Sequence, residues 1–269
     1  MEIDKSKEYE IIVFPNQDEG LKAQRVLFSK SIDLKHISTL AVVILQEHKD
    51  AACRAIIDED VLISGHYPFL YRDYEEDFFK KAKEYKGLDS NGEFLKSITL
   101  CYVAPCMADE KKIRLIGYFD RDITEILPYL NAVIKGASYN KNAAILTYAK
   151  ERRLINFYNI KVTIAKADDI IDAWVILDEV KKLINSTYSS RDTIKPSYEE
   201  KVKVTALQIY GWLPKTNCKA CGEATCLAFA CKLLLGEQKL SKCIPLSTEH
   251  KFVENKNIMQ EMAEALGVA

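Results

Sequence analysis

The sequence has no hydrophobic run long enough to cross a membrane as a helix. Its best candidate, ISTLAVVIL at residues 37–45, has nine residues, whereas a membrane-spanning helix needs about 20. The first ten residues, MEIDKSKEYE, are charged and lack the apolar stretch and small-residue cleavage site of a signal peptide. We therefore expect a cytoplasmic protein without a membrane span.

The sequence also lacks an excess of charge of either sign. Lys and Arg total 38 and Asp and Glu total 39, which gives a formal net charge of -1. This balance gives no support to nucleic acid or an anionic membrane as a partner. With 269 residues, of which 48% are hydrophobic, the chain can bury a substantial core and is long enough for two domains.

The motifs of several large enzyme classes are missing. No G-x-G-x-x-G, Walker A or G-x-S-x-G stretch occurs, so nucleotide binding and serine catalysis have no motif support. The histidines show no H-x3-H or HExxH spacing and are expected to be structural or solvent-facing: His36, His48, His66 and His250. We assign no catalytic residue from the sequence.

Strand and helix signals alternate through residues 1–110, which predicts a mixed α/β region. Residues 10–14, EIIVF, form a short apolar run of the kind expected of a buried strand, and helical spacing follows in residues 19–31. A second strand is expected at residues 40–45, and a later charged helix is expected to stop at Gly87.

The order of signals in residues 111–186 predicts an antiparallel sheet with two helices on one side. The first helix is expected at residues 120–136, where Pro128 would kink or split it. The second is expected at residues 166–188, and the acidic pair Asp168 and Asp169 is most simply its cap.

The remaining residues divide into three parts. Residues 187–204 are polar, contain Pro196 and are expected to be a linker. Residues 205–246 are expected to form a small module of their own, followed by a C-terminal helix in residues 247–269. The predicted fold class is α+β: a mixed α/β N-terminal region, an antiparallel sheet with helices on one side, and a small, mainly helical C-terminal module.

The cysteines are concentrated in this last module. Five of the eight lie in residues 215–243, KTNCKACGEATCLAFACKLLLGEQKLSKC. In a reducing compartment, clustered cysteines are metal ligands or redox thiols more often than disulfides. Four thiolates are the usual protein ligands of a [4Fe-4S] cluster. Three local cysteines and one returning cysteine can supply them: Cys218, Cys221, Cys226 and Cys243.

Helix geometry predicts which thiol is left over. In a helix of residues 225–235 that stops at Gly236, Cys231 lies roughly 140° around the axis from Cys226 and cannot easily face the same cluster. Because free cysteine tends to be packed inside, Cys231 is expected to be a buried hydrophobic residue. The alternatives to an iron–sulfur cluster are zinc, whose structural sites generally pair two short knuckles, and no metal.

Residues 205–246, TALQIYGWLPKTNCKACGEATCLAFACKLLLGEQKLSKCIPL, resemble the [4Fe-4S] domain at the N-terminus of the large subunit of the corrinoid iron–sulfur protein of acetyl-CoA synthesis. Related domains occur in the B subunit of Rnf-type electron-transport complexes. The shared features are IY-x2-LPKTNC, C-x2-CG-x2-TC, the LAFA that follows, GE at the helix end and the final C-x-PL. The resemblance implies that the cluster ligands are Cys218, Cys221, Cys226 and Cys243.

The resemblance covers about 42 of the 269 residues. It differs in position, because here the module is C-terminal and only 23 residues follow Leu246, so we do not expect the methyl-carrier role of the large subunit to transfer. Residues 116–132 and 166–178 are similar to the region that precedes this module in other bacterial iron–sulfur proteins. That likeness implies an architecture and no activity.

Two further cysteines raise the question of a second site. Cys101 and Cys106 are five positions apart and would face opposite sides of a continuous strand, although Pro105 could break the strand and let them converge. They are expected to be buried or incidental thiols, with a redox or ligand site as the alternative. Cys53 is expected to be a small core residue on a helix.

The leading hypothesis is a cytoplasmic electron-transfer protein of anaerobic metabolism that is not itself an enzyme. Its [4Fe-4S] cluster would deliver single electrons to a redox partner, and the resemblance implies a corrinoid protein or another low-potential redox enzyme. One alternative is a redox enzyme or activator with its active site in residues 1–200, which a deep pocket near Cys101, Cys106 and residues 113–119 would favour. Another is an assembly factor for iron–sulfur or other metal cofactors.

Overall fold

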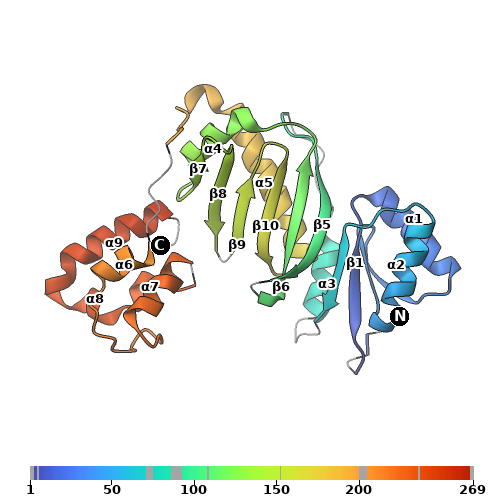
Figure 1. Cartoon of the computed structure of the whole chain (residues 1–269), viewed down its shortest axis with the longest axis horizontal. Helices are drawn as coiled ribbons and strands as arrows, with labels where there is room; N and C mark the ends of the chain where they lie inside the picture. The colour runs from blue at the N-terminus through green and yellow to red at the C-terminus, as the bar shows by residue number, and fades with distance from the viewer. Residues whose placement is uncertain are drawn as a thin grey trace. The chain divides into compact units, whose positions relative to one another are not determined.

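The computed structural model of the chain describes residues 3–4, 6–70, 75–85, 93–107, 109–151, 153–199, 205–235 and 237–266 (Figure 1). In these residues the strands are β1 (Tyr9–Val13), β2 (Leu34–Ser38), β3 (Ala41–Leu45), β4 (Gly65–Phe69), β5 (Ile98–Cys106), β6 (Asp109–Phe119), β7 (Ser138–Asn140), β8 (Ile145–Lys150), β9 (Arg153–Phe157) and β10 (Lys161–Ala167). The α-helices are α1 (Gln17–Ser29), α2 (Lys49–Asp58), α3 (Glu75–Glu84), α4 (Leu127–Val133), α5 (Ile170–Ser189), α6 (Ala206–Trp212), α7 (Cys226–Leu234), α8 (Ile244–Thr248) and α9 (Val253–Leu266).

The strands belong to one mixed sheet, with the order β2-β3-β1-β4-β5-β6-β10-β9-β8-β7. The described pairings beyond residue 111 are antiparallel, as predicted. The parallel pairing joins β4 to β5, where Gly65 lies opposite Val103. The α+β class is confirmed, with helices and a sheet that is mixed because of this parallel pair.

The first compact unit comprises Met1–Asp122 and Ile160–Ser186. Its β1 is buried at every residue and lies between β3 and β4, antiparallel to both, as its apolar run predicted. Asn16 begins α1 by accepting a hydrogen bond from the Glu19 N–H at 2.9 Å. Apolar side chains of α1 and α2, among them Leu27 and Ile56, are buried in one core with residues of β1 and β3.

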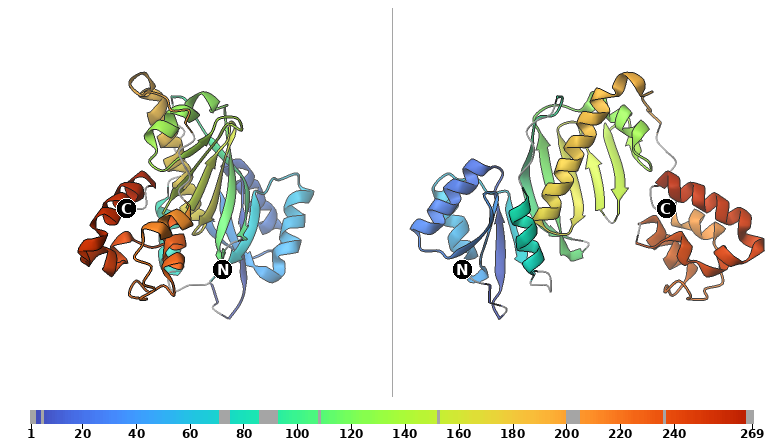
Figure 2. Two further views of the ribbon diagram at one scale, coloured as in Figure 1. Left: turned by 60° about the vertical axis from the view of Figure 1, so that its left-hand side comes forward. Right: turned by 180° about the vertical axis from the view of Figure 1, so that it is seen from behind.

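Helix α5 runs along strands β5, β6 and β10 of this unit (Figure 2). Gly117 of β6 permits the close approach, because a Cβ there would lie 3.1 Å from the Leu177 side chain. Trp174 is fully buried and stacks on Tyr85 with ring centroids 5.3 Å apart. The amide of Asn185 accepts the N–H groups of Phe94 and Leu95, each at 2.9 Å. The predicted stop at Gly87 lies outside the described residues.

The second unit comprises Ile123–Asn159 and Thr187–Ala269. The helix predicted at residues 120–136 is shorter than expected and is split near Pro128: a short 3-10 turn, Thr124–Ile126, precedes α4. Pro128 lies in the first turn of α4, where its missing N–H costs no helical hydrogen bond. Proline therefore marks the start of this helix and not its middle.

The residues predicted as a linker are partly structured. Helix α5 continues to Ser189, and a 3-10 turn follows at Arg191–Thr193. Further on, Ser197 donates its N–H to the Pro128 carbonyl at 3.0 Å, and the Asn131 amide donates to the Ser197 carbonyl at 3.0 Å. This stretch is thus attached to α4. Residues 200–204 lie outside the described residues.

Helices α6 to α9 form the C-terminal part of the second unit. The single helix predicted for residues 247–269 is instead the end of α8, a 3-10 turn at His250–Phe252 and α9. The turn follows Glu249, whose extended backbone interrupts the helical path. Within the described part of the chain, none of the helices combines the length and apolar character that crossing a bilayer requires.

Candidate iron–sulfur centre

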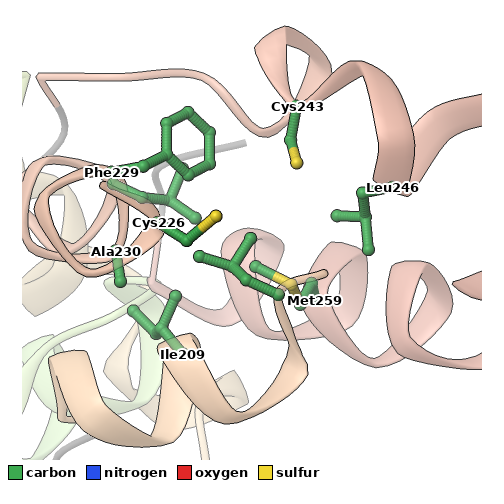
Figure 3. Close-up of a cluster of buried hydrophobic side chains, with 9 residues drawn as sticks. Ile209, Cys226, Phe229, Ala230, Cys243, Leu246 and Met259 are labelled. Carbon is green, nitrogen blue, oxygen red and sulfur yellow. The ribbon is translucent and has the colours of Figure 1, made fainter. Parts of the chain in front are cut away.

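The cysteine-rich segment folds around a small core of its own. Two of the predicted ligands, Cys226 at 8% and Cys243 at 6% exposure, belong to this core. Figure 3 shows them among side chains from the surrounding helices. The other buried members are Ile209, Leu213, Phe229, Ala230, Leu233, Leu246 and Met259. Packing of the protein chain therefore holds these two thiols in place, independently of a metal.

The start of α7 positions Cys226. Thr225 caps the helix, with its hydroxyl accepting the Ala228 N–H at 3.0 Å. The Asn217 side chain accepts the N–H of Cys226 itself at 2.8 Å. Because Asn217 directly precedes Cys218, this hydrogen bond attaches the loop that carries the first two cysteines to the helix that carries the third.

The loop before α7 has an unusual backbone that sequence reasoning did not anticipate. Its left-handed residues are Lys215 (φ 60°), Asn217 (φ 47°), Lys219 (φ 60°) and Gly222 (φ 87°). The Gly222 N–H donates to the Lys219 carbonyl at 2.9 Å and closes the turn around Cys221. Such backbone exposes N–H groups on one side, as anion-binding loops do. The loop is therefore shaped to surround negative charge.

Backbone N–H groups already reach two of the thiols. The Ala220 N–H, followed by the Thr216 hydroxyl, lowers the pKa of the exposed Cys218. Burial raises the pKa of Cys243, and the Leu246 N–H partly opposes that effect. Negative charge on the other three thiols raises the pKa of Cys243 further, to a smaller extent. Hydrogen bonds of this kind tune iron–sulfur clusters.

The four predicted ligands line one hollow of about 300 Å³, its open mouth included: Cys218, Cys221, Cys226 and Cys243. Among the described residues, no three His, Cys, Asp or Glu side chains are grouped closely enough to enclose a single metal ion. In a [4Fe-4S] cluster each thiolate binds a different iron, so the thiols need only surround a common space. The donor set and its hollow fit this group.

Glu223 connects three segments around the hollow and was missed in the sequence. One of its carboxylate oxygens accepts from the Gln238 amide at 2.7 Å and from the Lys232 ammonium at 2.9 Å. These two contacts lower the pKa of Glu223, with Gln238 the larger cause. The network joins the loop after Cys221 to α7 and to the segment that returns toward Cys243. Lys and Gln at such distances in sequence give no local signal of it.

Cys231 does not line the hollow, in agreement with its predicted position on the far side of the helix. The prediction that it is buried is wrong, because its side chain is exposed. Helix α7 is Cys226–Leu234 and buries one face only, through residues such as Phe229 and Leu233. A module of this size has too little chain to cover both faces of the helix. Gly236, the predicted stop, lies outside the described residues.

The three cysteines outside the module, Cys53, Cys101 and Cys106, differ in their burial and surroundings. Strand β5 continues through Pro105, and it contains an exposed Cys101 and a buried Cys106. The register shifts on either side of Cys101 and again between Pro105 and Cys106. Cys53 is half-buried on α2, beside the core of the first unit, as expected of a small packing residue.

A small helical module with four thiols around one hollow defines the class of iron–sulfur domain. Residues 213–245 match the model of a family described as "Putative Fe-S cluster". The chain is also 47% identical over 60 residues to acetyl-CoA decarbonylase/synthase complex subunit gamma of Methanocaldococcus jannaschii. It is 52% identical over 40 residues to the corrinoid/iron-sulfur protein large subunit of Moorella thermoacetica. The predicted resemblance and an iron–sulfur cofactor are confirmed.

These likenesses cover a small part of the chain and a small part of each relative. The match to the Methanocaldococcus protein covers 22% of this chain and 12% of that protein. The match to the Moorella protein covers 15% of this chain and 9% of that protein. A solved Argonaute from Marinitoga piezophila, in complex with guide RNA and target DNA, is 12% identical with a TM-score of 0.15, too low to indicate a common fold. The likenesses leave the larger part of the chain unassigned.

The hydrogen bond from Cys226 to Asn217 can be tested by two substitutions. Asn217→Ala should destabilise the module by about 1–3 kcal/mol. It removes the side-chain oxygen that accepts the Cys226 N–H at the start of α7, and it places alanine in a left-handed conformation. Asn217→Gly should cost less, since glycine adopts that conformation freely. Denaturant unfolding followed by cluster absorbance measures both. Equal stability of the two variants would show that the backbone strain is absent.

Proposed function

We propose that this protein is an iron–sulfur electron-transfer protein in which Cys218, Cys221, Cys226 and Cys243 hold one [4Fe-4S] cluster. The observation that carries the proposal is the single hollow lined by these four thiols, within residues that match an iron–sulfur family. The bound cluster supplies transfer of one electron at a time. The chain's own residues hold it, limit its contact with water and donate N–H groups to sulfur.

The four cysteines differ in their exposure to solvent, and this difference indicates the side of the cluster from which a partner can approach. Cys226 and Cys243 are buried in the module core, whereas Cys218 and the residues beside it are exposed. The Cys218 edge is therefore where a partner approaches most closely and where the electron leaves or enters. Ala220 donates its N–H to this same thiol, so the hydrogen bond that stabilises negative charge lies at the exit edge.

The charges near this edge favour an acidic partner surface. Lys219 lines the hollow, and Lys215 and Lys242 are each next in sequence to a lining residue. All three are exposed. Lysines around a docking edge steer negatively charged partners and fix their orientation. The named relatives are a subunit of an enzyme complex and a corrinoid protein subunit, so we place the partner among such redox proteins, in the cytoplasm of an anaerobic cell.

Anaerobic reconstitution tests the proposal. The protein should bind about four iron and four sulfide per chain, show broad visible absorption, and lose part of it on taking up one electron. It should regain that absorption when an acidic electron acceptor is added, with the rate falling as salt rises. Colourless protein that binds zinc would contradict the cofactor. A cluster that passes intact to an apo-ferredoxin would instead indicate an assembly factor.

A further inference from the structure

Strand β2 is the edge strand of the sheet in the first unit. It pairs with β3 in antiparallel orientation, and no other strand of the described residues lies beside it. On the open side of such an edge, alternate residues direct their N–H and C=O groups away from the sheet. A strand of another chain can pair with these groups and extend the sheet across an interface.

The side chains of β2 leave this edge accessible. Lysine on an edge strand commonly prevents pairing, because an incoming strand would bury its charge. Lys35 is turned elsewhere: its ammonium lies 3.8 Å from the centroid of the Phe79 ring of α3. The register with β3 is regular from Leu34 to His36 and shifts only after His36. The first three residues of β2 therefore keep the regular geometry that a further strand needs.

An apolar stripe on helix α1 lies beside this edge. Leu21, Gln24 and Phe28 are spaced by three and four residues, which places them on one face of the helix. Leu21 is 41% exposed and Phe28 is 85% exposed. The stripe and β2 line one groove of about 490 Å³, to which Ile32 and Leu34 add further apolar surface. An exposed aromatic side chain beside an open strand edge is typical of a protein–protein interface.

The groove also carries one charge of each sign. Arg25 of α1 and Asp33, which directly precedes β2, both line it. Both side chains are exposed, and neither forms an ion pair within the part of the chain that the structure describes. A two-fold axis places the same surface of two copies face to face, so a cation at one position can meet an anion at the other in both directions.

The position of α1 on β2 determines where these charges would meet. The Gln24 amide donates to the Ser38 carbonyl at 3.1 Å, so the neighbouring Arg25 lies near the Ser38 end of β2. Asp33 lies at the opposite end of the strand. If two copies of β2 pair in antiparallel orientation about the middle residue, His36, Asp33 of one copy lies opposite the residue that follows Ser38 in the other. This pairing brings each Asp33 to the end at which the other copy carries Arg25.

We propose that the protein is a symmetric homodimer in which the β2 strands of two copies pair in antiparallel orientation. The two α1 helices then lie side by side on one face of the continuous sheet, with Phe28 of each copy against Leu21 of the other. Arg25 and Asp33 form two equivalent ion pairs across the axis. A second copy fits this surface because the apolar stripe and both charges are complementary to themselves. The proposal does not depend on the electron-transfer function.

Sedimentation velocity of the full chain tests the dimer. The wild type should sediment as a species of twice the 30.6 kDa of one chain. Phe28→Lys should raise the dissociation constant at least about a hundredfold, because the change enters a two-fold interface twice. Ile57→Lys is the control: Ile57 is 56% exposed on α2 and does not line the groove, so this variant should dimerise like the wild type. A monomeric wild type, or unchanged dimerisation of Phe28→Lys, would overturn the proposal.

Charge reversal tests the arrangement of the two copies. Arg25→Asp alone sets like charges opposite each other at both pairs, as does Asp33→Arg alone, so each variant should dimerise about tenfold or more weakly than the wild type. An equimolar mixture of the two variants restores an opposite-charge pair at both positions and should form a heterodimer of wild-type affinity. Circular dichroism verifies that these exposed substitutions leave the fold intact. A mixture that dimerises as weakly as the separate variants would overturn this arrangement.

Discussion

Cys226→Ala should abolish the stable cluster, whereas Cys231→Ala should leave it intact. The two residues lie on the same helix and the substitution is chemically the same, so they form a matched pair. Cys226 is buried and lines the hollow, while Cys231 is exposed and does not. Iron content and visible absorption after anaerobic reconstitution should fall to near zero in the first variant and remain at the wild-type value in the second.

One result would contradict this prediction. If Cys231→Ala loses as much iron as Cys226→Ala, the ligand set is wrong. Folding of both variants is checked by circular dichroism, since Cys226 also packs in the module core and its truncation removes a few apolar contacts. Cys226→Ser provides the second variant, because serine preserves the size of the side chain but is a poor ligand for iron. Cys226→Ser should keep most of its helix content by circular dichroism while it loses most of its iron.

Gly65→Ala should destabilise the first unit by roughly 3 kcal/mol or more. Gly65 has φ of +147°, a conformation that side chains rarely adopt. A Cβ on this residue would lie 2.1 Å from the Val103 carbonyl oxygen, which belongs to the backbone of β5 and cannot rotate away. The parallel pairing of β4 and β5 would have to widen. Denaturant unfolding followed by circular dichroism measures the loss.

Gly211→Ala is the control for this change. Gly211 lies in α6, and a Cβ there meets no atom within 4 Å. Because alanine favours helix more than glycine does, this variant should be unchanged or more stable by up to about 1 kcal/mol. If both variants lost stability equally, the clash at Val103 would not be the cause.

Local patterns in the sequence predicted the parts of the fold that depend on neighbouring residues. The apolar run of β1, the strand β3 and the amphipathic α5 were each recognisable from spacing alone. The parallel pair of β4 and β5 was not, because it joins segments 38 residues apart through Gly65 and Val103. Pairings of this length depend on tertiary packing, which one sequence does not reveal.

The cysteine module shows the same division. The spacing of the cysteines predicted the four thiols that line the hollow, because cysteines that bind one metal centre tend to occur at short, characteristic separations in the sequence. The positioning groups were missed: Asn217 acts nine residues away on Cys226, and Glu223 acts on Gln238 across fifteen. The prediction that Cys231 is buried was wrong, because it relied on the general tendency of free cysteine to be buried and took no account of how little chain surrounds α7.

The separation of Cys243 from the other three thiols has a mechanical consequence. A cluster bound to Cys218 and Cys243 would act as a cross-link that closes a ring of chain containing α7 and the Glu223 network. Cross-links restrict the unfolded ensemble and so stabilise the folded one by removing chain entropy. Helices α6 and α9 lie outside this ring, and Ile209 and Met259 reach its core only through packing. A cluster held in this way would fasten the middle of the module, whereas α6 and α9 pack on it through apolar side chains and are joined to each other by the hydrogen bond from the Asn255 amide to the Trp212 carbonyl.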